Sequence, residues 1–225
     1  MTKQNGFLVS LAILGLSAMM ASCGGGSGSS SSGKKLASND VFGDLPNLIY
    51  QHNNQDAELK DEAKKKQEGL PFNESGLKKA KEIDDKYSAK REAADEKFFA
   101  DVEKLKPSLV GKDIPFEVED GLPYEIISYK IADVGQYGGV SYELTFKILD
   151  AKAITTNWSN EYRMPGCFID KDGNEMEKAG GDCGVVISKE EHVDGAILTQ
   201  QGVLTTFVSP EMYVNFAKNR FTIKK

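Results

Sequence analysis

The chain changes character at Pro107, and this change constrains its fold more than any other feature. Before it, residues 54–106 are dense in Ala, Glu, Lys and Asp and contain a single proline, Pro71. After it, aromatic and β-branched residues become frequent, and apolar and polar side chains begin to alternate. Helices favour the first composition and strands favour the second. The sequence therefore predicts an α+β chain in which helices precede an all-β part.

Pro71 divides the helical part into two helices, because proline cannot continue a helix and a glycine and an asparagine flank it. We expect the first helix over residues 46–68. We expect the second over residues 73–106, with Asn73 or Ser75 as its N-cap.

The second predicted helix carries a narrow apolar stripe that needs a partner. Its apolar residues recur mostly at spacings of three and four, as one face of a helix requires. They are Leu77, Ala80, Ile83, Tyr87, Ala94, Phe98, Val102 and Leu105. Lys90 and Arg91 interrupt the stripe in its middle. An antiparallel hairpin within one chain is the favoured interpretation. An oligomerising coiled coil is the alternative, although the break at residues 69–76 leaves no sustained heptads.

Residues 140–148 form the clearest strand of the second half. Apolar residues alternate here with polar ones, which gives the strand one apolar face and one solvent-exposed face. The apolar residues include Val140, Tyr142, Leu144 and Phe146. Similar short runs are separated by turn signals rich in glycine. They cover residues 116–119, 124–131, 154–158, 163–169, 184–187, 196–199, 203–208 and 221–223.

Many short strands with frequent turns predict a β-sandwich of about seven strands over residues 107–225. Ser209 followed by Pro210 predicts a short helix before the last strand, because proline is favoured at the first helical position. In architecture this half resembles the immunoglobulin-like domains of many bacterial surface and periplasmic lipoproteins. A mixed α+β sheet domain is the alternative.

The N-terminus has the parts of an export signal. Lys3 supplies a positive charge, residues 7–21 are almost wholly apolar, and small residues precede Cys23. The apolar run is shorter than the roughly 20 residues that a spanning helix needs. Residues 20–23 (MASC) resemble the lipobox of bacterial lipoproteins, with Met20 in place of the usual leucine, as in the looser boxes of the Bacteroidetes.

This resemblance implies that signal peptidase II removes residues 1–22 and that Cys23 carries the lipid anchor. A secretory peptide cut elsewhere, with Cys23 incidental, is the alternative. The Gly/Ser run over residues 24–33 favours lipidation, because such a run stays a flexible tether. Gly24, where inner-membrane lipoproteins tend to have Asp, implies an outer-membrane location. A missing acidic export signal implies the periplasmic face.

These features divide the chain into four parts: a lipoprotein signal peptide (1–22), a lipidated cysteine with a Gly/Ser linker (23–38), a charged helical hairpin (39–106) and a β-sandwich domain (107–225). The formal net charge of −6 argues against a general affinity for nucleic acid or for anionic membranes. We expect the chain to contact the membrane through its N-terminal lipid and to bind envelope proteins or glycans. The sequence leaves its oligomeric state open.

Cys167 and Cys183 remain as an even pair once Cys23 is lipidated, and an exported chain meets an oxidising compartment. This predicts a disulfide between them. A turn at residues 171–174 would place Cys167 opposite Lys178, so the bridge requires the chain after Lys178 to fold back. Two buried free thiols are the alternative.

The segment DKDGNE, residues 170–175, is the strongest metal motif in the chain. Asp170, Asp172 and Asn174 match the first three ligand positions of a calcium loop. The sixth position lacks glycine, and the twelfth, Gly181, lacks a carboxylate. An ordinary hairpin turn is therefore the favoured interpretation, with calcium as a weak candidate. We expect no cofactor.

No sequence motif assembles a nucleophile with a base, so we do not expect an enzyme. Trp158, Tyr162 and Phe168 are candidate ligand contacts on an exposed face, with core positions as the alternative. The expected function is that of a membrane-anchored envelope lipoprotein acting as a binding module. The alternatives are a structural spacer that oligomerises through its helices and a glycan-acting hydrolase with unrecognised carboxylates.

Overall fold

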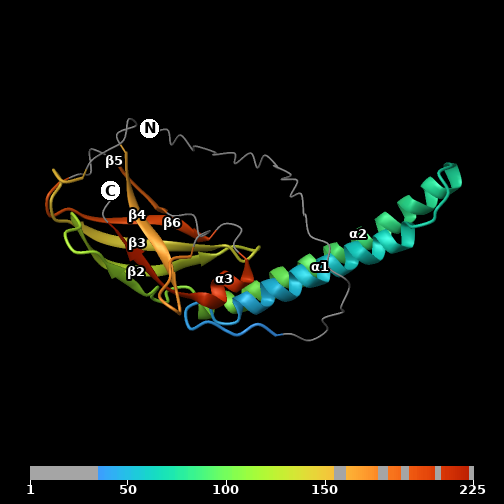
Figure 1. Cartoon of the computed structure of the whole chain (residues 1–225), viewed down its shortest axis with the longest axis horizontal. Helices are drawn as coiled ribbons and strands as arrows, with labels where there is room; N and C mark the ends of the chain where they lie inside the picture. The colour runs from blue at the N-terminus through green and yellow to red at the C-terminus, as the bar shows by residue number, and fades with distance from the viewer. Residues whose placement is uncertain (1–34, 155–160, 177–181, 189–192, 206–208, 223–225) are drawn as a thin grey trace, which may run out of the picture. The chain divides into compact units, whose positions relative to one another are not determined.

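The computed structural model divides the chain into Met1–Lys34 and a compact unit, Lys35–Lys225. Within the second, the structure describes residues 35–154, 161–176, 182–188, 193–205 and 209–222. The predicted signal peptide, Cys23 and most of the predicted linker lie outside the described residues. Two long helices precede all the described strands, and this confirms the α+β class and its order (Figure 1).

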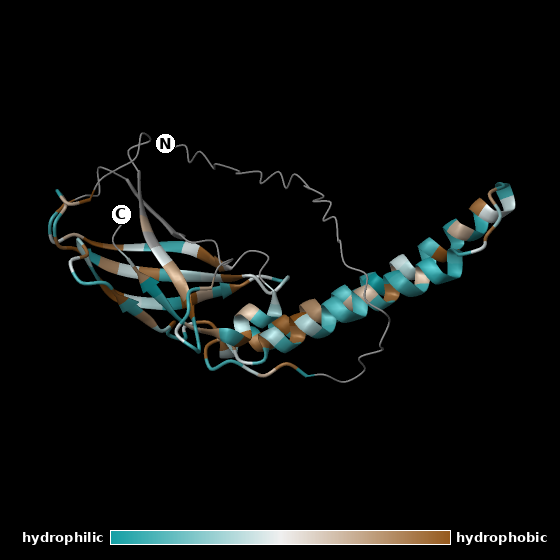
Figure 2. Ribbon diagram, in the orientation of Figure 1, coloured by the Kyte–Doolittle hydropathy of each residue, from teal (hydrophilic) through white to brown (hydrophobic). Residues whose placement is uncertain are grey.

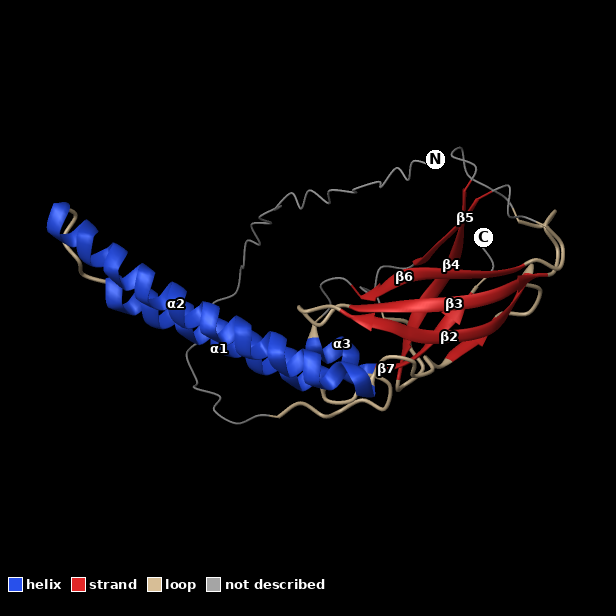
Figure 3. Ribbon diagram, turned by 180° about the vertical axis from the view of Figure 1, so that it is seen from behind, coloured by secondary structure: helices blue, strands red, loops and turns tan. Residues whose placement is uncertain are grey.

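Helices α1 (Leu45–Gln67) and α2 (Glu74–Leu105) pack against each other as the expected hairpin (Figure 3). The Asn73 side chain caps α2 by accepting a hydrogen bond from the Gly76 N–H at 2.9 Å. A short 3₁₀ turn, η1 (Lys106–Ser108), follows α2 at the proline that was expected to end it. Capping and proline signals thus placed the helix ends correctly.

The described strands form two sheets. One has the order β1 (Phe116–Val118), β7 (Phe216–Phe221), β4 (Glu161–Asp170) and β5 (Asp182–Ser188), and the other the order β2 (Tyr124–Val134), β3 (Val140–Ile148) and β6 (Ile197–Thr205). The β1–β7 pair is parallel and the remaining pairs are antiparallel. The short helix α3 (Pro210–Asn215) begins after Ser209, as expected, and leads directly into β7.

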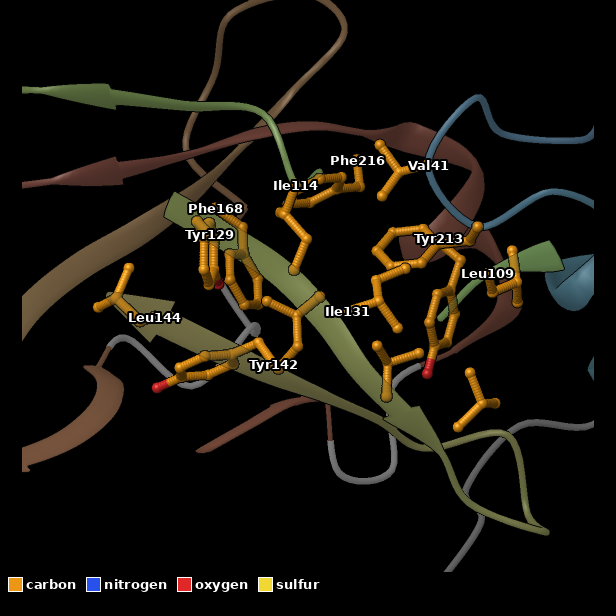
Figure 4. Close-up of a cluster of buried hydrophobic side chains, with 14 of the residues drawn as sticks. Val41, Leu109, Ile114, Tyr129, Ile131, Tyr142, Leu144, Phe168, Tyr213 and Phe216 are labelled. Atoms are coloured by element: carbon orange, nitrogen blue, oxygen red, sulfur yellow. The ribbon is translucent and has the colours of Figure 1, made fainter. Parts of the chain in front are cut away.

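The inner faces of the two sheets share one aromatic core (Figure 4). Every second residue of β3 is buried, as its alternating sequence requires. The Tyr129 ring of β2 lies 5.6 Å from the Phe221 ring of β7 and 5.1 Å from the Tyr142 ring, measured between centroids. Each large side chain of this kind contributes about 1.5–3 kcal/mol when fully buried.

The base of the helical hairpin belongs to the same core. Val102 of α2 is fully buried with the strand residues. The Asn39 side chain donates a hydrogen bond to the Phe216 carbonyl at 2.9 Å, and the Tyr213 hydroxyl donates to the Gly138 carbonyl at 2.8 Å. The expected boundary after residue 106 therefore separates helices from strands in the sequence, while their apolar cores are continuous.

Strand β6 differs from the sequence-based expectation. The sequence predicts two strands with a turn at residues 200–202, whereas β6 runs unbroken through this segment. Gly202 lies directly opposite Tyr142 on β3. A Cβ atom at Gly202 would lie 2.4 Å from the Tyr142 hydroxyl oxygen. The glycine therefore makes room for a buried ring and does not mark a turn.

The strand order also differs from that of immunoglobulin domains. In those domains strands one, two, four and five form one sheet, and strands three, six and seven form the other. Here β1, β4, β5 and β7 share one sheet and β2, β3 and β6 share the other. In addition, β7 begins at Phe216, directly after α3, and not at residue 221 as expected. Residues 155–158 of a further predicted strand lie outside the described residues.

Candidate functional site

Polar contacts hold the outer half of the helical hairpin in register. The Arg91 Nε of α2 donates to the Asp56 Oδ1 of α1 at 2.5 Å. Nearer the loop, the Gln67 side chain donates to the Asp84 Oδ1 at 2.6 Å. Arg91 was expected to interrupt the apolar stripe of α2. The structure shows how this interruption is accommodated, since Arg91 forms an ion pair across the hairpin.

The apolar stripe of α2 extends beyond its partner helix. Helix α1 ends at Gln67, whose side chain reaches the Ala80 carbonyl at 3.3 Å. The residues of α2 before Ala80 therefore have no facing turn of α1. Leu77, expected at the start of the buried stripe, is 57 % exposed for this reason. Its assignment to the helix–helix contact was wrong.

The loop between the helices is closely folded. Gly69 adopts a positive φ of 80°, and the Asn73 N–H donates to the Pro71 carbonyl at 2.9 Å. Gly76 lies so close to this loop that a Cβ atom there would be 1.8 Å from the Pro71 carbonyl oxygen. The same loop leaves the Phe72 side chain outside the packing, and Phe72 is 96 % exposed.

Basic residues flank this exposed ring on both helices. We refer to residues 64–81, which comprise the loop and the adjoining helix ends, as the hairpin tip. Its lysines are all exposed, and they are Lys64, Lys65, Lys66, Lys78, Lys79 and Lys81. The distal part of the hairpin is accordingly hydrophilic with isolated apolar positions (Figure 2). The hairpin tip can thus contact an apolar and negatively charged surface.

A second surface lies on the four-stranded sheet, where three strands bring polar groups into a row. Because β1 and β7 pair in parallel, Glu117 lies opposite Arg220, and β4 places Cys167 on the other side of Arg220. Glu117 forms ion pairs with both Arg220 and Lys218. Glu175, just after β4, also approaches Arg220, with its Oε1 3.8 Å from Nη1.

This row borders an open cavity of about 700 Å³. Its charged lining consists of Arg220 and the carboxylates of Glu117, Glu119, Asp120 and Glu175. The cavity is therefore acidic, with one guanidinium among four carboxyl groups. Such a lining can pair with a cationic or polar ligand.

The charges around the cavity also limit its chemistry. Hydrogen bonds from Lys218 and then Arg220 lower the pKa of Glu117, so this carboxyl stays ionised at neutral pH. Burial, and to a smaller extent the nearby Glu175, raise the pKa of the Cys167 thiol. A protonated thiol is a weak nucleophile. Glu117 and Cys167 therefore supply neither a proton-donating carboxyl nor a thiolate.

The calcium candidate forms a turn in the structure. The Asp170 Oδ1 accepts hydrogen bonds from the backbone N–H groups of Asp172 at 2.9 Å and Asn174 at 2.8 Å. Gly173 between them has a φ of 87°, which a non-glycine residue rarely adopts. Within the described part of the chain, no three His, Cys, Asp or Glu side chains group as metal ligands. The hydrogen bonds that Asp170 accepts from the turn backbone agree with the hairpin-turn interpretation.

The aromatic candidates are not brought together as a binding face. Phe168 is 8 % exposed, and its ring lies 5.6 Å from the Phe216 ring in the core. It packs between the sheets and does not present a surface to a ligand, which corrects its assignment as a ligand contact. Trp158 and the side chain of Tyr162 lie outside the described residues.

Cys167 is a free, half-buried thiol, and the side chain of Cys183 lies outside the described residues. The β4–β5 register places Asp182 opposite Pro165, two residues before Cys167. A disulfide requires Cα atoms within about 7 Å of each other. β5 would therefore have to slide along β4 to form it, and the bridge stays a prediction.

None of the described helices is both long and apolar enough to cross a membrane. Comparisons with protein-family models, with curated proteins and with solved structures found no match to this chain. The function is therefore argued from the two surfaces described above.

Sequence reasoning missed both of these surfaces. The exposure of Phe72 had a local signal, since an aromatic residue in a Pro/Asn break between lysine-rich helix ends has no helical face to join. The pairing of Glu117 with Arg220 had no local signal in the sequence. These residues come from strands at opposite ends of the β-rich half, and no local pattern records their parallel pairing.

Proposed function

We propose that the chain is a lipid-anchored lipoprotein of the bacterial envelope that serves as an interaction module, with the hairpin tip as its contact surface. The observation that carries the proposal is the exposed Phe72, which a closely folded loop presents at the end of α1 and α2 away from the sheets (Figure 1). Phe72 is the most exposed of the large apolar side chains among the described residues, and the Asn73 cap orders the backbone beside it. The lipobox-like segment ending at Cys23 supports the lipid anchor.

The proposed location is the periplasmic face of the outer membrane, supported by Gly24 after the cysteine. The β-rich half acts as the rigid body of the module. Its two sheets share a core as the sheets of a β-sandwich do, and we propose its likeness to immunoglobulin-like domains at that level alone, because the strand order differs.

Metabolic labelling with radioactive palmitate tests the anchor. The full-length chain, expressed in a bacterium that processes lipoproteins, should incorporate label and fractionate with the outer membrane. Cys23→Ser should abolish the label, whereas the matched control Cys167→Ser should retain it. Label that persists in Cys23→Ser contradicts the proposal.

A glycan hydrolase is the second candidate, and the acidic cavity around Arg220 is the observation that favours it. Such enzymes pair an ionised carboxylate with a carboxyl of raised pKa. Glu117 fits the first role, because its pKa is lowered. Release of reducing sugar from envelope glycans by wild type, and its loss in Glu117→Gln, would establish this alternative.

The oligomerising spacer is separated from the interaction module by sedimentation velocity of residues 34–225. The hairpin uses its own apolar stripe to pair α1 with α2, which favours a monomer. A concentration-independent dimer or trimer would support the spacer instead.

A further inference from the structure

The hairpin tip combines an exposed aromatic ring with a charge opposite in sign to that of the whole chain. Residues 64–81 contain six lysines against Glu68 and Glu74, a net charge of +4, whereas the full chain carries −6. The six lysines are exposed on both sides of the loop that presents Phe72. Any partner of this surface must therefore accept an apolar group surrounded by cations.

Lys79 and Lys81 lack the preceding carboxylate that pairs with other lysines of the hairpin, including Lys65 of the tip, which pairs with Asp61 at 2.6 Å. In α1, Lys60 pairs with Asp56 at 2.7 Å, four residues before it. Lys79 and Lys81 have Ser75 and Leu77 at that spacing, so no carboxylate stands there. Their charge remains directed to solvent.

The size of the apolar surface favours a lipid partner over a protein partner. Phe72 and Leu77 are the large apolar side chains that the tip exposes among the described residues. A specific protein interface buries about 1,200–2,000 Å², which needs many more contacts. A lipid surface needs no matching shape, since one or two apolar side chains enter the head-group region while lysines stay near the phosphates.

The folded loop also lowers the cost of such docking. Gly76 packs against Pro71, and Asn73 caps α2, so the backbone that carries Phe72 is ordered before any contact is made. A preformed loop loses little conformational entropy on binding.

We propose that the hairpin tip docks on an anionic phospholipid surface, with Phe72 inserted among the head groups and the flanking lysines near the phosphates. The inference rests on the proposed interaction function and names the partner of its contact surface. The chain then contacts lipid at two points, through the acyl chains on Cys23 and through the hairpin tip.

Vesicle co-sedimentation tests this docking. Residues 35–225 form one compact unit with its own apolar core, so this fragment keeps every described contact and lacks the lipid anchor. It should partition onto vesicles of phosphatidylcholine with added phosphatidylglycerol, and far less onto phosphatidylcholine alone. Added salt should release it, because salt screens exposed charges beyond about 10 Å at 0.1 M.

Two variants of the hairpin tip should weaken the partitioning by separate mechanisms. Phe72→Ser removes the inserted ring and should lower the partition coefficient about tenfold. Lys79→Gln with Lys81→Gln should lower it roughly 25-fold at low salt, about fivefold for each lysine near an anionic surface. All six positions changed in these variants and in the controls below are exposed, so circular dichroism should show unchanged folding.

Matched controls carry the same chemical changes elsewhere. Ile197→Ser removes a 63 % exposed apolar side chain from β6, and Lys152→Gln with Lys171→Gln removes the same charge from exposed turns. Both controls should bind anionic vesicles as wild type does.

Three outcomes overturn the proposal: no wild-type binding to anionic vesicles, equal binding to neutral vesicles, or equal binding by wild type and both tip variants. A Phe72→Ser variant that binds vesicles normally but loses a purified envelope protein also overturns it, and assigns the tip to a protein partner. Palmitate labelling depends on Cys23 and not on the tip. A failed vesicle test with intact labelling therefore rejects the docking site and leaves the lipid-anchored module standing.

Discussion

Replacement of Gly202 by alanine should destabilise the protein, although alanine is the better residue in an ordinary strand. Glycine in a strand interior costs roughly 0.5–1 kcal/mol relative to alanine. Gly202 lies within β6, opposite Tyr142, and its φ is not in the left-handed region. Sequence rules alone therefore predict that Gly202→Ala stabilises the fold.

The structure reverses this sign. The new Cβ would lie 2.4 Å from the Tyr142 hydroxyl oxygen, 2.5 Å from Cζ and 3.0 Å from Cε1. The Tyr142 ring cannot easily move away, because it is fully buried and packs edge-on against Tyr129 at 5.1 Å. Overpacking of this kind costs about 1–3 kcal/mol. Set against the alanine gain, the free energy of unfolding should fall by about 1–2 kcal/mol.

Urea unfolding of residues 35–225 measures the effect. With a slope of about 2 kcal/mol per molar urea, the midpoint should fall by about 0.5–1 M while the slope stays constant. Gly135→Ala is the matched control, since its Cβ would meet only the Gly139 carbonyl oxygen, at an ordinary 3.6 Å. The control should change stability by less than about 0.5 kcal/mol.

A double-mutant cycle identifies the cause. Tyr142→Leu removes the ring atoms that meet the new Cβ, so Gly202→Ala should cost little in that background, and the two changes should be strongly non-additive. A Gly202→Ala protein as stable as wild type, or additive effects in the cycle, would refute the packing role assigned to this glycine.

Three further predictions follow from the polar contacts. Burial raises the pKa of Asp56, but hydrogen bonds from the side chains of Lys60 and Arg91 outweigh this effect, so the pKa is lowered. The resulting stability is complete above the unfolded value of about 3.9 and is lost as the pH falls through the lower folded pKa. Asp56→Asn should therefore flatten the fall in unfolding midpoint between about pH 5 and pH 2; an unchanged pH profile contradicts the pairing. In a reduced Cys183→Ser variant, Cys167 should react with iodoacetamide more slowly when folded than in urea, because burial raises its pKa; equal rates contradict its burial. Asp170→Ala should cost about 1 kcal/mol of stability through lost turn hydrogen bonds, and calorimetric titration should show no sub-millimolar calcium binding, whereas a tight site lost in this variant would restore the calcium interpretation.

Features with a local cause were predictable from the sequence. The ends of α1 and α2 follow from Pro71 and from the Asn73 cap, which act on the backbone within a few residues. The strand over residues 140–148 follows from the alternation of apolar and polar residues, because a strand with one buried face requires an apolar side chain at every second position. Ser209 and the proline after it likewise placed α3.

Features that depend on distant partners were not predictable. Glu117 and Arg220 become neighbours because the first strand of the β-rich half pairs in parallel with the last. Nothing near either residue records that pairing. The sequence predicts a turn at Gly202, because a glycine that creates space for a ring and a glycine that turns the chain look alike until the opposing residue is known.

Leu77 shows why a helical stripe alone cannot define a contact. Periodicity identifies the face of α2 that a partner could cover, but the length of α1 decides how much of that face is covered. Since α1 ends at Gln67, the same spacing that buries Val102 leaves Leu77 in solvent. Extending α1 by one turn, with two apolar residues placed to face Leu77, should bury this leucine and raise stability. It should also weaken vesicle binding if the hairpin tip acts through its exposed apolar groups, so a more stable hairpin that binds lipid less would tie the short first helix to function.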